Sequence, residues 1–212
     1  MKNKAITVIL LLTLTFFSGC DDNGSGSDDA LIMPLAVGNS WHGILTTYAE
    51  DGSIMFEQSS VYYVTGEYNY NNQQWFEINH ALDGDTAEGV FVFRNNDDGL
   101  YALYETDSSI APPVLWAKHP ASKGDEYYSG PGDEEFVEVT DVNVVVPVLD
   151  VNYICNVYER EAVFYFDFPP IDVYSLGPNI GFVKIERHRS GLTGPHYLFQ
   201  VWELNYYLSG GN

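Results

Sequence analysis

The spacing of apolar side chains from Ala30 onward is the feature that most constrains the fold of this chain. Apolar residues recur at every second position, and no long stretch shows the i, i+3, i+4, i+7 spacing of an amphipathic helix. Gly, Asn-Asn, Asp-Gly and Pro clusters interrupt this alternation at short intervals. Such a pattern is typical of short antiparallel strands joined by tight turns. The sequence therefore predicts an all-β protein with little helix.

We predict about ten strands, bounded by residues that favour turns: 42–48, 54–66, 73–82, 89–94, 99–105, 126–129, 135–147, 152–166, 181–188 and 196–208. Asp51-Gly52 and Asn71-Asn72 connect the first three of these segments, and such residues tolerate the positive φ angles of hairpin turns. The regular spacing indicates an antiparallel meander. A barrel or a strongly curled sheet would protect the edge strands of that meander.

The segment 152–160 shows how the faces of a strand are expected to divide. Val151, Tyr153, Cys155 and Val157 should point to one side, and Asn152, Asn156 and Arg160 to the other. Because Cys155 shares its face with apolar neighbours, we expect it to be a buried and inert thiol rather than a nucleophile.

The first 20 residues carry a targeting signal. Lys2 and Lys4 form a basic start, and an apolar run from Ala5 to Phe17 follows, too short to span a bilayer as a helix. The run ends in Phe17-Ser18-Gly19-Cys20, which resembles the bacterial lipobox. This resemblance implies that residues 1–19 are a lipoprotein signal peptide and that Cys20 is the lipid-attachment residue. The alternative is an ordinary signal peptide with an incidental cysteine.

Residues 20–30 contain almost no apolar side chain and are predicted to be a flexible acidic tether, with a span of roughly 15–18 Å. The resemblance to lipoproteins implies membrane contact through N-terminal acyl chains, enough for stable anchoring. We therefore expect a location in the cell envelope, outside the cytoplasm. Outer membrane or cell surface is favoured, although Asp21 also resembles an inner-membrane retention signal.

A weak repeat divides the predicted β domain, residues 31–212. Pro34 to Trp41 and Pro120 to Tyr127 share the pattern Pro-x3-Gly-x2-aromatic, and each copy leads into a predicted strand. Proline fixes an extended conformation, Gly38 and Gly124 permit a turn, and the aromatic ring can cover the end of a sheet. The domain is therefore either a single unit or two similar halves, about 31–118 and 119–212. We expect Trp41 and Tyr127 to be mostly buried against one shared core.

A second resemblance covers most of the chain from about residue 34 to residue 188. Pro34-Leu35-x-Val37-Gly38-Asn39-x-Trp41 near the start and Gly177-x-x-Gly181-Phe182-Val183-Lys184 near the end are similar to a broad set of uncharacterised, β-rich bacterial envelope lipoproteins. That resemblance implies an extracytoplasmic β domain and no agreed activity. The residues that we assign to structural motifs are Gly38, Trp41, Gly124, Tyr127, Gly177, Gly181 and Lys184.

Charge excludes several function classes. The formal net charge is −21, and removal of residues 1–19 lowers it to −23 because Lys2 and Lys4 are lost with no acid. Nucleic acid is not expected as a partner, because phosphate backbones need clustered Lys and Arg. The five histidines show no metal-ligand spacing, the acidic loops fit no EF-hand, and no nucleophile elbow or phosphate-binding glycine loop occurs. The sequence thus implies no metal, no cofactor and no catalytic residue.

Two features leave room for ligand binding. The 16 tyrosines include doublets in which one ring must lie on the outer face or line a cavity. Arg160, Lys184, Arg187 and Arg189 cluster, either to pair with surplus acids or to form an anion-binding pocket. We favour a non-catalytic binding or interaction role, with a small molecule, a glycan or a protein as partner. The alternatives are a polysaccharide-directed hydrolase, which needs two carboxylates in one cleft, and a structural subunit of an envelope assembly.

Overall fold

The computed structural model describes residues 31–85, 89–106, 109–163, 169–191 and 196–210. The predicted signal peptide, Cys20 and the tether lie outside the described residues, as does the end of the predicted strand 152–166. The described residues form β structure with no helix, which confirms the all-β prediction. Within them no helix has the length and apolar content needed to cross a membrane.

Twelve strands form the main sheet, slightly more than the ten predicted. Their bounds are β1 Ser40–Tyr48, β2 Ile54–Tyr70, β3 Gln73–Leu82, β4 Gly89–Asn96, β5 Gly99–Leu103, β8 Val114–Lys118, β9 Glu126–Ser129, β10 Glu135–Val148, β11 Val151–Ala162, β12 Ile171–Gly177, β13 Gly181–Ser190 and β14 His196–Leu208. A separate two-stranded sheet pairs β6 (Glu105–Thr106) with β7 (Ser109–Ile110).

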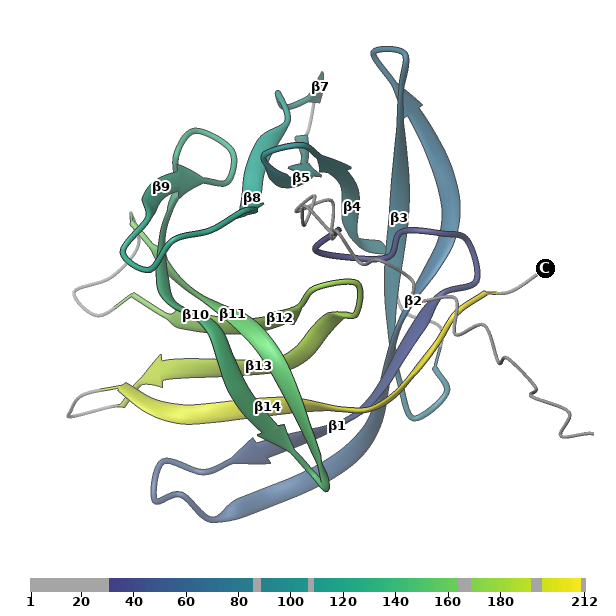
Figure 1. Cartoon of the computed structure of the whole chain (residues 1–212). Helices are drawn as coiled ribbons and strands as arrows, with labels where there is room; N and C mark the ends of the chain where they lie inside the picture. Colours follow the sequence, from purple (N-terminus) through teal and green to yellow (C-terminus); the bar gives the residue numbers. More distant parts are fainter. Residues whose placement is uncertain (1–30, 86–88, 107–108, 164–168, 192–195, 211–212) are drawn as a thin grey trace, which may run out of the picture.

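The sheet is a meander that nearly closes on itself. Its order is β8-β5-β4-β3-β2-β1-β14-β13-β12-β11-β10-β9, and neighbouring strands among the described residues pair antiparallel. The first six strands of the main sheet and the last six therefore form two successive runs, joined by the β1–β14 ladder. Figure 1 shows these runs as two curved walls around a shared interior. The edge strands β8 and β9 are neighbours in sequence and complete a barrel shape.

Two strands of the sheet were not predicted, β8 and β12. Each is short and follows a proline pair, Pro112-Pro113 before β8 and Pro169-Pro170 before β12. Proline has no backbone N–H to give to a ladder, so these segments read as loops in the sequence. Both strands begin directly after the prolines, where the missing donors cost nothing.

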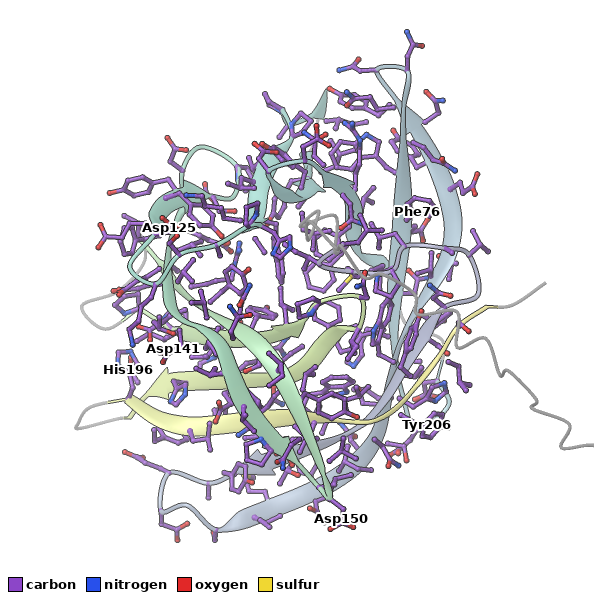
Figure 2. All side chains as sticks on the ribbon, viewed as in Figure 1. Phe76, Asp125, Asp141, Asp150, His196 and Tyr206 are labelled. Atoms are coloured by element: carbon purple, nitrogen blue, oxygen red, sulfur yellow. The ribbon has the colours of Figure 1, made fainter. Side chains whose placement is uncertain are left out.

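Aromatic side chains fill the interior between the walls (Figure 2). Phe182 is the central ring: it packs edge-on against Trp41 at 5.9 Å and lies 5.1 Å from Tyr62. Phe93 in β4 and Trp116 in β8, on the wall opposite to Phe182, approach each other with ring centroids 5.0 Å apart. All five are buried. Burial of such rings supplies most of the energy that holds a barrel of this width together.

Both faces of segment 152–160 carry buried side chains. Cys155 is fully buried, but Asn156 and Arg160 on the opposite face are also only 6% exposed. Register shifts in β10 after Val139 and Asp141 change how β11 meets its partner. Beyond that point Tyr158 and Arg160 are buried on one face of β11, while Glu159 and Glu161 on the other face are partly exposed. Arg160 consequently points into the barrel, with Tyr158 two residues before it.

Candidate functional site

The first Pro-x3-Gly-x2-aromatic copy forms a tight turn that docks on β2. Gly38 has a φ of 91°, a value that glycine adopts without strain. The amide of Asn39 donates to the carbonyl oxygen of Ala36 at 3.0 Å and closes the turn. The amide of Gly38 donates to the carbonyl of Val64, and the amide of Val64 donates to the carbonyl of Asn39.

The second copy, 86 residues further along the chain, makes the equivalent backbone hydrogen bonds. Gly124 has a φ of 83°, and the amide of Asp125 donates to the carbonyl of Ser122 at 3.0 Å. The amide of Gly124 donates to the carbonyl of Val139 in β10, whose own amide donates to the carbonyl of Asp125. The repeated sequence pattern thus corresponds to a repeated turn geometry. A division of the whole domain into two similar halves stays a prediction.

The first copy also contacts the glycine motif near the C-terminal end. The Trp41 indole N–H donates to the carbonyl of Ile180, in the turn between β12 and β13. A Cβ at Gly181 would lie 3.2 Å from the Trp41 indole nitrogen and 3.1 Å from the Met33 side chain, and Gly181 has a φ of 85°. Gly177 closes the same turn by accepting a bond from Ile180. The two motifs are therefore halves of one packing contact, in which Trp41 is fully buried.

Lys184 and Tyr127 do not take part in this packing contact. Lys184 is on β13 and contacts Glu186 at 3.2 Å and Glu203 at 4.0 Å, which makes it part of a carboxylate-paired strand surface. Tyr127 is half-buried against the main core and lies at the junction of β8 and β9. The structure therefore does not bring the motif residues into one site. Their visible roles are in turns, packing and barrel closure.

Side chains rather than a backbone ladder close the barrel between β8 and β9. The Tyr127 hydroxyl accepts a bond from the Lys118 amide at 3.2 Å and donates to the Trp116 carbonyl at 3.3 Å. The Tyr158 hydroxyl donates to the Lys118 carbonyl at 2.8 Å. The Lys118 ammonium meets the Asp125 carboxylate at 3.0 Å. These bonds satisfy the free edge of β8, which would otherwise expose unpaired backbone groups.

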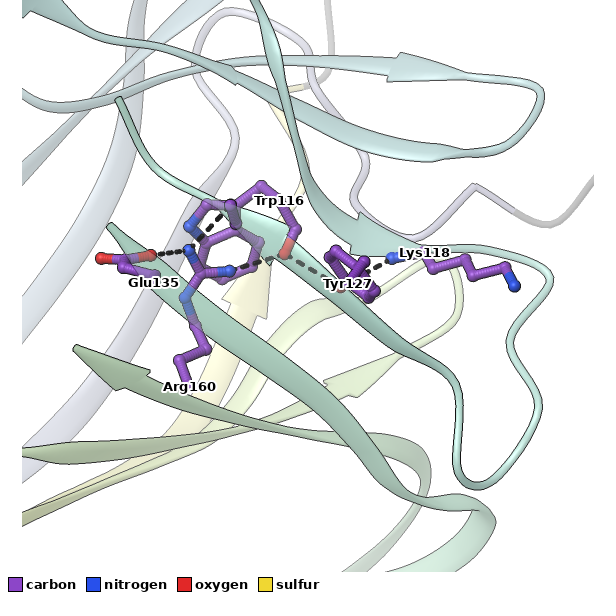
Figure 3. A network of polar contacts seen from close by, with 6 residues as sticks. Trp116, Lys118, Tyr127, Glu135 and Arg160 are labelled. Atoms are coloured by element: carbon purple, nitrogen blue, oxygen red, sulfur yellow. Dashed lines mark hydrogen bonds and ion pairs between the residues drawn. The ribbon is translucent and has the colours of Figure 1, made fainter. Parts of the chain in front are cut away.

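Arg160 is the centre of this junction, which we call the seam (Figure 3). Its guanidinium lies over the Trp116 ring, 4.7 Å from the centroid, and donates to the Trp116 carbonyl at 2.6 Å. It also donates to the Ser129 hydroxyl at 3.2 Å and is paired with the Glu135 carboxylate. One buried cation thus links β8, β9, β10 and β11.

A cavity of about 190 Å³ opens beside the seam, and we call it the mouth pocket. Aromatic rings form one part of its wall and charged side chains the other. Its lining residues are Phe91, Tyr104, Trp116, Glu135, Arg160, Glu161, Ala162, Pro170, Asp172, Tyr174 and Arg189. Burial raises the pKa of Tyr104 to about 12, and burial also raises the pKa of Tyr174. Both phenols therefore remain protonated at neutral pH and can donate hydrogen bonds.

A row of polar side chains, the polar row, runs from the mouth pocket across five strands. Its members pair directly across neighbouring strands and therefore share one face of the sheet: Arg160, Asp172, Arg187, Gln200 and Thr47. Contacts follow the row, since Arg187 reaches Gln200 at 3.4 Å and Gln200 reaches Thr47 at 3.3 Å. The predicted basic cluster is thus real for its three arginines, while Lys184 is not part of it.

One carboxylate serves two of these arginines. Asp172 lies 3.2 Å from the Arg189 guanidinium and 3.7 Å from Nε of Arg187. Nε of Arg187 is buried and has no hydrogen-bond partner among the described residues. The row therefore holds donors that its own carboxylate does not satisfy.

A serine–histidine pair lies further along the interior. The Ser60 hydroxyl is 2.7 Å from Nε2 of His80, and the His80 ring stacks on Tyr62 at 4.3 Å. Burial, helped by the charge of Arg187, lowers the pKa of His80 to about 4. Ser60 is only 3% exposed, and no described carboxylate bonds to His80. The pair lacks both the access and the third group of a catalytic triad.

A second cavity, of about 290 Å³, lies over β1, β2, β3 and β14, and we call it the side groove. Its most ordered feature is the His42 ring stacked on Tyr206 at 4.5 Å. Asp83 contributes a carboxylate that accepts a bond from the Ser59 amide at 3.0 Å. Unlike the mouth pocket, the side groove contains no cation among its lining residues.

The arrangement of the mouth pocket suits binding better than hydrolysis. Three carboxylates line it, but Glu135 is engaged by Arg160, and Asp172 by Arg187 and Arg189. A glycosidase needs one carboxyl free to protonate a leaving group and a second free to act as base or nucleophile. In the part of the chain that the structure describes, no group of three His, Cys, Asp or Glu side chains is arranged to hold a metal ion.

Sequence reasoning grouped the arginines but missed the pocket. Its wall comes from β4, β8, β10, β11, β12 and β13, which meet only through the register of the closed sheet. Trp116 and Tyr174 lie on β8 and β12, the two strands of the main sheet that were not predicted. A local signal did exist in β12, where the strand-favouring residues Ile171, Val173 and Tyr174 follow a proline pair and precede Gly177.

Comparison with known proteins gives the fold a precedent. No protein-family model matches the sequence, and no curated protein matches it. A solved protein from Bacteroides fragilis NCTC 9343, described as exported and as having a YmcC-like fold, aligns over 85% of this chain and 100% of its own length. Its identity is 16% and the TM-score is 0.50, so the two proteins share a fold. A protein described as a lipoprotein, from Parabacteroides distasonis ATCC 8503, aligns over 84% of this chain and 99% of its own, at 12% identity and a TM-score of 0.43.

Proposed function

We propose that this protein is a lipid-anchored protein of the cell envelope, located outside the cytoplasm, with a non-catalytic binding role centred on the mouth pocket. The observation that carries the binding role is the pocket itself, in which aromatic rings lie beside the ion-paired Arg160 and Arg189. Small-molecule sites commonly combine apolar walls with a few placed polar groups. The mouth pocket has both, since Phe91 and Tyr104 line it together with Arg189.

The anchoring part of the proposal rests on the N-terminal sequence and on the fold. The apolar run before Cys20 and the acidic tether after it resemble the leader of a bacterial lipoprotein. The fold-sharing protein from Bacteroides fragilis is described as exported, which supports a location beyond the cytoplasmic membrane. We favour the outer membrane or the cell surface.

Anchoring is tested by expressing the full chain and its Cys20→Ala variant in a bacterium and separating the membrane and soluble fractions. We expect the native chain in the membrane fraction, and the variant either soluble or held as an uncleaved precursor, since acyl chains are the proposed membrane contact. Unchanged membrane partition with normal maturation of Cys20→Ala would reject the lipid anchor.

Binding is tested by tryptophan fluorescence, because Trp116 lines the pocket. The purified Cys20→Ala chain is titrated with a panel of neutral, acidic and basic sugars and amino acids, and bound ligands are assayed for turnover. We expect at least one ligand to change the emission without being converted. A panel that leaves the emission unchanged would reject the mouth pocket as a small-molecule site, and turnover would favour the hydrolase alternative.

A further inference from the structure

Resting on the proposed binding function, we infer that the mouth pocket binds a sugar acid: a small ring that carries one carboxylate and several hydroxyl groups, as a uronic acid does. Arg189 is the residue that the carboxylate would meet. Each of the three parts of such a ligand has a matching part of the wall.

The carboxylate has a partner in Arg189. This side chain lines the pocket, keeps 36% of its surface exposed and lies 5.9 Å from the centre of the Phe199 ring, which holds its plane. The bonds that described residues make with it, to Asp172 and to the His188 carbonyl, both use Nη1. The other N–H groups of the guanidinium fork remain for a bidentate carboxylate.

The ring has a partner in the aromatic wall. Phe91 and Trp116 pack edge-on at 6.0 Å, and Trp116 and Tyr174 do so at 4.9 Å, so the wall offers apolar ring surface, with Phe91 the least buried of the three rings. The cavity volume of about 190 Å³ is a little larger than the roughly 150 Å³ of an apolar cavity that holds one benzene ring. This space suits one sugar ring rather than a long acyl chain or a folded peptide.

The hydroxyl groups have a partner in Glu161. This carboxylate lines the pocket, and no described residue pairs with it, in contrast to Glu135 and Asp172. An ionised carboxylate only accepts hydrogen bonds. It would therefore repel a second acidic group and favour ligand hydroxyls, so the pocket should prefer a hydroxylated acid over a purely aromatic one.

The basic residues of the chain concentrate around this pocket. The chain from residue 20 onward has a formal charge of −23, and three of its seven basic residues, Arg160, Arg187 and Arg189, lie in or next to the mouth pocket. The lining holds three carboxylates, of which Glu135 and Asp172 are already paired with arginines. Arg189 is the more exposed of the two lining arginines and is therefore the cation that an acidic ligand can reach.

The test compares four probes by isothermal titration of the Cys20→Ala chain: glucuronate, galacturonate, glucose and benzoate. We expect at least one sugar acid to bind ten-fold or more tightly than glucose and benzoate. In Arg189→Gln that affinity should fall at least ten-fold, with an intermediate loss in Arg189→Lys, which keeps the charge but not the fork. Arg94→Gln is the matched control, since Arg94 lies outside the pocket and contacts Asn96 and Trp75.

The remaining outcomes separate the inference from the proposed function. Equal binding of glucose and glucuronate, or full affinity in Arg189→Gln, would overturn the sugar-acid inference and leave a binding pocket in place. Failure of both sugar acids to bind, while another ligand of the wider panel binds, would overturn only the inference. A trigalacturonate probe in the same assay distinguishes sources: tighter binding than galacturonate indicates a polysaccharide unit, and weaker binding indicates a free sugar acid.

Discussion

Replacement of Arg160 by methionine should destabilise the protein more than any change of a surface charge. Methionine keeps the apolar stem of the side chain but removes the guanidinium, which is 6% exposed. The buried carbonyl of Trp116 then loses its 2.6 Å bond, Ser129 loses its 3.2 Å bond, and Glu135 loses its cation. Breaking a buried ion pair from one side costs about 3–5 kcal/mol. Glu135 is 36% exposed and can rehydrate, so we expect about 3 kcal/mol.

Two further estimates agree with this magnitude. One hydrogen bond from a charged donor contributes about 1.5–3 kcal/mol, and a desolvated cation–π contact such as that of Arg160 over Trp116 contributes up to about 2 kcal/mol. The assay is urea unfolding of the native and variant chains, followed by tryptophan emission and by circular dichroism. Coincident transitions justify a two-state free energy of unfolding.

The control is Lys123→Met, which removes a cation of an exposed ion pair. Lys123 lies 2.7 Å from Asp141, but the two side chains are 65% and 45% exposed. Such pairs contribute about 0–1 kcal/mol. A loss below about 1 kcal/mol in Arg160→Met, or a loss equal to that of Lys123→Met, would refute the claim that Arg160 holds the seam together.

Four further predictions concern single side chains. Trp41→Ala should lower the free energy of unfolding by about 3–5 kcal/mol, because a fully buried ring is lost. Urea melts that show less than half of this loss would contradict the core role of Trp41. Tyr127→Phe should lower the free energy of unfolding by about 1 kcal/mol, because only its seam bonds are lost. Burial lowers the pKa of His80 from its ordinary value of 6.5 to about 4, so between these pH values the unfolded chain binds more protons than the folded protein. The free energy of unfolding should therefore fall as the pH drops from 6.5 toward 4, and this fall should be smaller in His80→Asn. Equal slopes of stability against pH in the two proteins would exclude a role for His80. Burial raises the pKa of Cys155 to about 12, so in the Cys20→Ala chain a thiol reagent should label this cysteine only after the protein unfolds. Rapid labelling of the native protein would instead show that the structure opens around Cys155.

Much of the fold was accessible from local patterns, because strands leave a period-two signal and turns leave Gly, Asn and Asp. Asn71 and Asn72 show this, with φ angles of 53° and 60° between β2 and β3. The prediction failed where two local signals competed, as in β8 and β12, where proline pairs suggested loops. Proline restricts only its own amide, so a strand can begin on the next residue.

The candidate site was less accessible, for a different physical reason. A polar side chain in a strand is usually expected on the solvent-exposed face, and the sequence therefore does not predict Arg160 as a core residue. Inside a barrel a charged residue can be buried if other strands bring partners, as Trp116 and Glu135 do here. Those partners are 44 and 25 residues away in sequence. Only the register of the closed sheet brings them together.

The most direct test of the account is to locate the bound ligand on the protein. Two-dimensional NMR can follow the backbone amide, arginine Nε–H and tryptophan indole N–H signals of the nitrogen-15-labelled Cys20→Ala chain during titration with galacturonate. We predict that the signals of Arg189, Arg160 and Trp116 shift together along one saturating curve, while those of Trp41 and Trp75 stay in place. Shifts centred instead on His42 and Tyr206 in the side groove, or saturation with no change at Arg189, would contradict the account.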